Sequence, residues 1–118
     1  MKRRRSRAGL EAQVEGAKSS RQKAIALFQL ALFHDNNARE SDAIPLYEKA
    51  LKAGLDSAPK AKALAWLASS LYKTGEPKRA MTRIRQSRAI VTRTKDASLE
   101  KFLAGLDARI ARSLAKQS

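Results

Sequence analysis

The sequence predicts an all-α fold built from repeated helical hairpins, with about five helices in total. Five positions with the same order of large and small side chains occur twice, 37 residues apart: Leu27, Leu30, Ala31, Ala43 and Tyr47, then Leu64, Leu67, Ala68, Ala80 and Ile84. The 118 residues include only five glycines and three prolines, and good helix formers dominate the rest. A repeated hairpin cannot bury its apolar face alone, so its copies must stack on one another.

The first nineteen residues are expected to differ from the rest of the chain. Residues 1–7 form a basic arm, and Leu10, Val14 and Ala17 follow at helical spacing. This spacing predicts a short capping helix that ends near Gly16. The alternative is one long helix from Leu10 onward. We therefore expect an arm with a possible capping helix over 1–19 and a repeat domain over 20–118.

The first strong helix is expected over residues 20–35. Ser19 followed by Gln22 fits a capping box, in which each side chain satisfies a free N–H of the first turn. The pair Asn36–Asn37 then predicts a turn.

The second helix of this hairpin contains a proline that must avoid losing a helical hydrogen bond. We place Pro45 in the first turn, with Ser41 or Asp42 as the N-cap, because the first N–H groups of a helix have no partner in it. Gly54 is the expected end of this helix.

The same kinds of capping and stop residues delimit the two helices of the second hairpin, and a last helix follows them. Asp56, Ser57 and Pro59 begin a helix that runs to Thr74, and Gly75 ends it. Pro77 begins the next helix, which continues to about Arg93. The fifth helix, Ser98 to about Lys116, carries apolar residues three and four positions apart: Leu99, Phe102, Leu103, Leu106, Ile110 and Leu114.

These repeated residues resemble the tetratricopeptide repeat (TPR), a helix–turn–helix unit of about 34 residues. Gly75 stands at the position of the turn glycine, whereas Ala38 occupies that position in the first unit and Ser87 replaces a usual alanine in the second. The resemblance covers residues 20–93, giving two full repeats plus a capping helix. The run 43–50 is similar to small stand-alone bacterial TPR proteins. The resemblance implies a protein-binding adaptor.

The sequence contains no constellation of residues typical of catalysis, metal binding or cofactor binding. His34 is the only histidine, cysteine is absent, and the glycines are isolated. A phosphate loop needs clustered glycines, a metal site needs several ligating side chains, and an activated nucleophile needs a base beside it. The longest apolar stretch, residues 24–33, is about half the length needed to cross a bilayer. We therefore expect a cytoplasmic protein that is neither an enzyme nor a membrane protein and that uses no cofactor.

The resemblance implies that the ligand-facing surface comes from the first helix of each unit. The residues expected there are Phe28, Gln29, Leu32, Asn36, Lys62, Trp66, Ser69 and Lys73. Such a groove suits a peptide or helix with apolar anchors and some acidic residues. Two alternatives stay open: Trp66 packs on the preceding helix against Tyr47 or Leu51, and the segment with Leu10 and Val14 covers Ile25, Phe28 and Leu32.

The net charge supports a competing hypothesis. Lys and Arg number 25 against 11 acids, for a formal charge of +14. Two blocks, residues 2–7 and 78–95, hold much of this positive charge. The alternative function is therefore binding of nucleic acid or another polyanion. The candidate residues for it are Arg3, Arg4, Arg5, Arg79, Arg83 and Arg88. A third possibility is that exposed repeat ends join copies of the chain, which leaves monomer and homo-oligomer both open.

Overall fold

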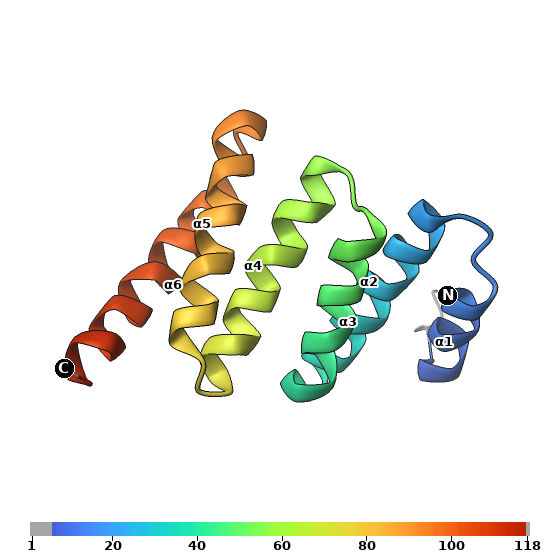
Figure 1. Cartoon of the computed structure of the whole chain (residues 1–118), viewed down its shortest axis with the longest axis horizontal. Coiled ribbons are helices and arrows are strands. Elements are labelled where there is room, and N and C mark those ends of the chain that lie inside the picture. Colours follow the sequence, from blue (N-terminus) through green and yellow to red (C-terminus); the bar gives the residue numbers. More distant parts are fainter. Residues whose placement is uncertain (1–5, 118) are drawn as a thin grey trace, which may run out of the picture. The chain divides into compact units, whose positions relative to one another are not determined.

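The computed structural model describes residues 6–117, and the all-α prediction is confirmed for them (Figure 1). The elements are α1 (Arg7–Glu15), α2 (Ser20–Asn36), α3 (Glu40–Ala53), α4 (Ser57–Lys73), α5 (Pro77–Thr94) and α6 (Ala97–Lys116). The described residues thus form six helices rather than about five, because the possible capping segment is helical as well.

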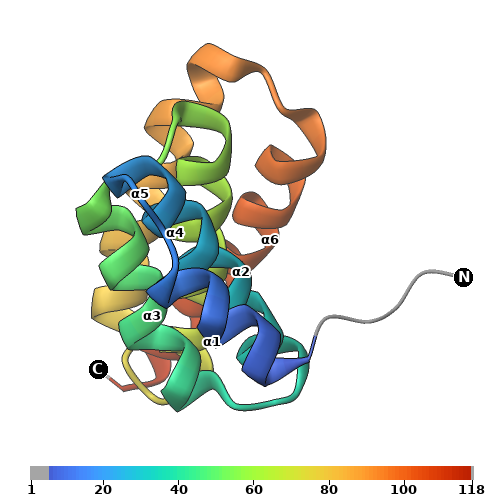
Figure 2. The ribbon, with the colours of Figure 1, turned by 90° about the vertical axis from the view of Figure 1, so that its right-hand side faces the viewer.

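The chain divides into two compact units. The first ends at Leu55 and holds α1, α2 and α3; the second begins at Asp56 and holds α4, α5 and α6. Within the first unit α2 packs on α3 and α1 packs on α2, as Figure 2 also shows. Within the second unit α4 packs on α5, and α6 contacts both of them. Each unit therefore consists of one helical hairpin and one additional helix.

The break between α1 and α2 lies where glycine and serine predicted it. Gly16 caps the C-terminus of α1, so a continuous helix from Leu10 onward is wrong. At the start of α2, the Ser19 Oγ accepts a hydrogen bond of 3.1 Å from the backbone N–H of Gln22. The Gln22 Oε1 in turn accepts one of 3.0 Å from the N–H of Lys18. The capping box is confirmed, except that its return bond reaches one residue further back.

The start of α3 corrects the expected position of Pro45. The helix begins at Glu40 with Arg39 as its N-cap, so Pro45 is the sixth helical residue and does not lie in the first turn. The helix begins earlier because the N–H of Arg39 donates to the His34 carbonyl at 2.9 Å, which closes the turn tightly. Pro45 leaves the Ser41 carbonyl without its helical donor, but both residues are exposed, so water can bond that carbonyl.

The core of the first unit centres on Tyr47. This side chain of α3 is fully buried, and its hydroxyl donates a 2.8 Å hydrogen bond to the Asp35 Oδ2 on α2. The Phe28 ring lies 6.1 Å from the Tyr47 ring. Gly54 ends α3 with a φ of 106°, a conformation that favours glycine.

The second unit repeats this arrangement with different contacts. Gly75, at a φ of 87°, separates α4 from α5, and Pro77 is the first residue of α5, as predicted. The buried Ser87 Oγ on α5 donates a 2.7 Å hydrogen bond to the Ala61 carbonyl on α4. The apolar face of α6 is buried as its spacing predicts, through Leu99, Leu103, Leu106 and Ile110.

Candidate functional site

A line of partly exposed side chains follows one face of α2. Ile25, Gln29, Leu32 and Asn36 lie four, three and four residues apart, so they share one face of the helix. Ile25 is 42% exposed, more than any other large apolar side chain of residues 6–117. Gln29 and Leu32 are half-buried. This line, called the α2 face below, combines apolar contact area with amide groups.

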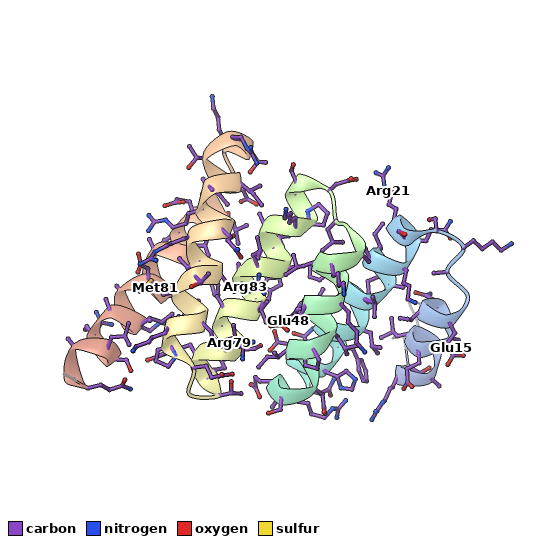
Figure 3. All side chains as sticks on the ribbon, in the orientation of Figure 1. Glu15, Arg21, Glu48, Arg79, Met81 and Arg83 are labelled. Carbon is purple, nitrogen blue, oxygen red and sulfur yellow. The ribbon has the colours of Figure 1, made fainter. Side chains whose placement is uncertain are left out.

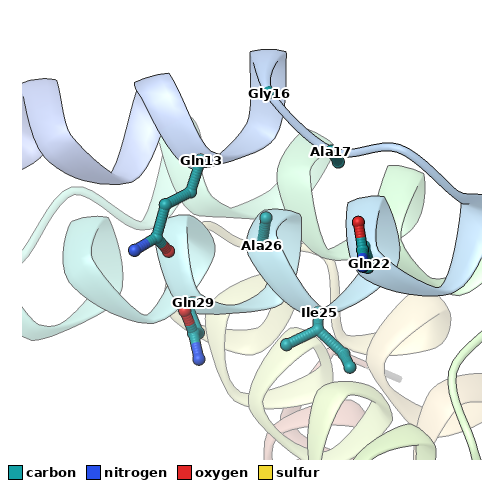
Figure 4. A pocket seen from close by; sticks show the side chains of 7 residues that line it. All are labelled: Gln13, Gly16, Ala17, Gln22, Ile25, Ala26 and Gln29. Carbon is teal, nitrogen blue, oxygen red and sulfur yellow. The ribbon is translucent and has the colours of Figure 1, made fainter.

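A pocket of about 350 Å³ lies beside the α2 face. Its lining comes from α1, the α1–α2 connection and α2: Gln13, Gly16, Ala17, Gln22, Ile25, Ala26 and Gln29. Figure 4 shows Gln13 reaching from α1 toward α2, with Ala26 to its right and Gln29 and Ile25 below. Two alanines and the Ile25 side chain give the pocket apolar walls, and three glutamines give it hydrogen-bonding groups at its edge. The pocket is large enough for one apolar side chain of a partner.

The structure corrects the expected role of Phe28. Its side chain is 9% exposed and packs against Tyr47, so it belongs to the core of the hairpin and not to a binding surface. The alternative in which the segment with Leu10 and Val14 covers Ile25, Phe28 and Leu32 is wrong for Ile25. Helix α1 buries Leu10 against α2, yet Ile25 stays exposed.

In the second unit, α4 carries a line of the same spacing. Lys62, Trp66, Ser69 and Lys73 follow one another four, three and four residues apart, with the two lysines exposed and the two central residues half-buried. The Trp66 ring packs edge-on against Phe102 of α6, with 4.7 Å between ring centroids and 73° between planes. The sequence pointed to Tyr47 or Leu51 as the packing partner of Trp66. The observed aromatic partner lies 36 residues further along the chain, so local spacing gave no signal for it.

His34 has a structural role in the turn between α2 and α3. It is buried, and its Nδ1 accepts a 3.0 Å hydrogen bond from the Arg39 Nε. The Arg39 guanidinium also lies 5.5 Å from the centre of the Phe33 ring. Burial, and secondarily the positive charge of Arg39, lower the pKa of His34. The described residues contain no group of three or more His, Asp or Glu side chains that could hold a metal ion.

The predicted polyanion-binding residues divide according to their contacts. Arg3, Arg4 and Arg5 lie outside the described residues. Arg79 forms a 2.8 Å ion pair with Glu76, and Arg83 Nη1 donates a 3.0 Å hydrogen bond to the Gln86 Oε1. Figure 3 shows Arg79 and Arg83 on one side of α5.

Arg88 connects α5 to α6 through two carboxylates. Its Nη2 lies 2.7 Å from the Glu100 Oε1, and its Nη1 lies 3.0 Å from the Asp107 Oδ2. Two negative charges therefore accompany this guanidinium, so a polyanion would compete with Glu100 and Asp107 for Arg88. Its pairing is invisible in sequence because the partners lie 12 and 19 residues away, on another helix.

The two hairpins of matching sequence, each completed by a further helix, define a helical-repeat protein. A family model described as tetratrico peptide repeat matches residues 24–115. The chain therefore belongs to the TPR family, whose repeats are non-catalytic modules that generally mediate protein–protein interaction. No curated protein and no solved structure matches the chain. None of the helices within residues 6–117 is long and apolar enough to cross a membrane.

Proposed function

We propose that the protein is a non-enzymatic interaction module that binds a peptide or helix of a partner protein on the α2 face. The observation that carries this proposal is the exposure of Ile25 beside a pocket with apolar walls. An isolated apolar side chain on a surface is ordinary. Here it continues into the half-buried Leu32 on the same helix face, and the family generally works by protein contact.

The chemistry of the α2 face indicates what kind of segment it fits. Apolar side chains of a partner helix, spaced three and four residues apart, would contact Ile25 and Leu32 and place one group in the pocket. Glutamine side chains at the edge match the backbone or polar groups of such a segment. Acidic residues in the partner are favoured because the chain carries a net charge of +14, which attracts an acidic segment during encounter.

The α4 line is proposed as a second contact of the same type. It places exposed lysines at both ends of a half-buried tryptophan, an arrangement that fits an apolar anchor with acidic neighbours. Its geometry is fixed within the second unit by the contact of Trp66 with Phe102. Binding at the α2 face does not depend on this second contact.

Affinity purification from the native host, followed by mass spectrometry, supplies candidate partners for a binding test with purified proteins. We expect Ile25→Gln to weaken binding about tenfold, which corresponds to about 1.4 kcal/mol, because it removes the exposed apolar contact. The matched control is Ala12→Gln, which also changes an exposed apolar residue to glutamine in the first unit. Isothermal titration calorimetry gives the affinities, and far-UV circular dichroism confirms that both variants are folded.

The result that contradicts the α2 face is equal affinity of Ile25→Gln and the wild type for every reconstituted partner. Trp66→Ala then distinguishes binding at the α4 line from binding at the α2 face. A loss of affinity in this variant alone would assign binding to the α4 line, and unchanged affinity in both variants would remove both surfaces from consideration.

A further inference from the structure

The outer face of α5 carries three exposed cations that neither the family nor the α2 face explains. Lys78, Arg85 and Arg93, called the basic stripe below, lie seven and eight residues apart on the side opposite the buried residues of the helix. At a rise of 1.5 Å per residue, neighbouring members of the stripe are separated by about 10 to 12 Å along the helix axis.

The cations of α5 differ in whether a carboxylate neutralises them. Arg79 pairs with Glu76, and Arg88 pairs with Glu100 and Asp107. The basic stripe has no ion pair or hydrogen bond from its side chains to any residue of 6–117. From residue 56 to the C-terminus the sequence holds fourteen Lys and Arg against five acids, and three of those five neutralise Arg79 and Arg88. Residues 77–95 include no acid at all.

Helix stability does not account for the basic stripe. Lys78 is the second residue of α5 and lies at the positive end of the helix dipole, where a cation is unfavourable. The first turn of α5 contains no acid that would offset it. Arg93 lies in the last turn, where a cation is favourable, whereas Arg85 lies near the middle and gains nothing from the dipole. The stripe therefore includes one residue that costs stability and one that is neutral.

The side chains between the cations indicate which partner the stripe fits. The exposed positions among them are Thr82, Gln86, Ala89 and Thr92, so this face has no large apolar anchor. The two threonine hydroxyls donate to carbonyls of α5, which leaves the amide N–H groups of Gln86 as the uncharged donors of this face. Protein partners need such an anchor at the centre of an interface. Unpaired bases need aromatic side chains to stack on, and the stripe has none. Cations and amides are among the groups that contact a sugar–phosphate backbone.

We propose that the basic stripe binds the phosphate backbone of a nucleic-acid duplex without reading its sequence. The affinity comes from release of the counterions that surround the phosphates, and three contacts contribute about 2.7 to the slope of log K against log salt. This function goes beyond the proposed peptide binding and uses a helix, α5, that carries neither the α2 face nor the α4 line. Loss of one activity therefore leaves the other measurable.

Fluorescence anisotropy of the full chain with a labelled DNA duplex and an RNA duplex of about 20 base pairs tests the proposal, over about 50 to 200 mM salt. At about 50 mM salt, the triple variant Lys78→Gln/Arg85→Gln/Arg93→Gln is expected to bind at least about tenfold more weakly than the wild type. The slope of its log K against log salt should be smaller in magnitude by about 2.7. Arg85→Gln alone should lower the slope by about 0.9 and serves if the triple variant fails to fold. The two duplexes show whether both backbone types bind.

The matched control removes the same charge from exposed positions of α6, as Lys101→Gln/Arg109→Gln/Arg112→Gln. We expect this control to keep most of the salt slope. Equal losses in the two triple variants would overturn the proposal in favour of diffuse charge. Tighter binding of single-stranded RNA than of duplex, or competition by polyglutamate as strong as that by unlabelled duplex, would also overturn it. Absence of duplex binding at the lowest salt concentration would refute the proposal.

Discussion

Two buried serines of the second unit have opposite hydrogen-bonding states. The Ser87 hydroxyl donates to the Ala61 carbonyl at 2.7 Å, which explains why a polar residue is tolerated where the repeat usually has alanine. The Ser70 hydroxyl is fully buried as well, and it has no hydrogen-bond partner. A buried hydroxyl without a partner costs free energy, whereas a bonded one contributes about 1 kcal/mol.

Ser87→Ala should therefore lower the free energy of unfolding by about 1 kcal/mol, because the hydrogen bond between α5 and α4 is lost. The Ala61 carbonyl keeps its helical donor, so no orphaned group enlarges the effect. Ser70→Ala, the matched control, should leave the free energy unchanged or raise it. Urea unfolding followed by circular dichroism measures both. Equal losses in the two variants would show that packing of the side chain, and not the hydrogen bond, determines the effect.

At the level of elements, the turns of the two hairpins both contain a residue with a positive φ, but the residue type differs. Ala38 has a φ of 59° between α2 and α3, and Gly75 has a φ of 87° between α4 and α5. A left-handed conformation costs an L-residue about 1 to 2 kcal/mol and costs glycine little. The departure from the repeat pattern at Ala38 is thus a point of backbone strain.

Ala38→Gly should raise the free energy of unfolding by about 0.5 to 1 kcal/mol, since relief of strain exceeds the added flexibility of the unfolded chain. Gly75→Ala is the reverse test and should lower it by about 1 kcal/mol. A Cβ added at Gly75 would meet no atom within 4 Å, so only the backbone contributes. Denaturant unfolding at constant m-value checks the pair. A loss of stability in Ala38→Gly would mean that the turn is not strained.

The elements also show what could be predicted from the sequence. Local signals located the helix ends well, because Gly16, Ser19, Gly54, Gly75 and Pro77 act through their own backbone and immediate neighbours. Pro45 was misplaced because the tight turn before α3 starts that helix earlier than capping residues suggest.

Contacts between helices were beyond such local reasoning. A helical wheel shows which arc of one helix is polar, but not which neighbour covers it. The pattern therefore placed Phe28 on a surface although Tyr47 buries it, and it gave no sign that Phe102 packs on Trp66. The neutralisation of Arg88 by α6 was missed for the same reason. These contacts decide which predicted site residues stay available to a partner.

For the molecule as a whole, the net charge of +14 opposes folding. Like charges repel more strongly in the folded chain than in the expanded unfolded chain, and most of the cations are exposed. The Debye length falls from about 30 Å at 0.01 M salt to about 8 Å at 0.15 M, so added salt screens this repulsion. Salt also weakens individual ion pairs such as that of Arg88 with Glu100, but partly exposed pairs contribute at most about 1 kcal/mol.

Raising NaCl from about 0.01 to 0.15 M should therefore increase the Tm by several degrees, because a gain of about 1 kcal/mol corresponds to about 4 to 8 °C in a domain of about 60 to 100 residues and to about 2 to 4 °C in one of about 150 to 250. Differential scanning calorimetry measures the shift. The α6 variant Lys101→Gln/Arg109→Gln/Arg112→Gln lowers the net charge by three and should show a smaller rise. A Tm that falls with added salt would mean that the ion pairs joining the helices outweigh the repulsion of the whole chain.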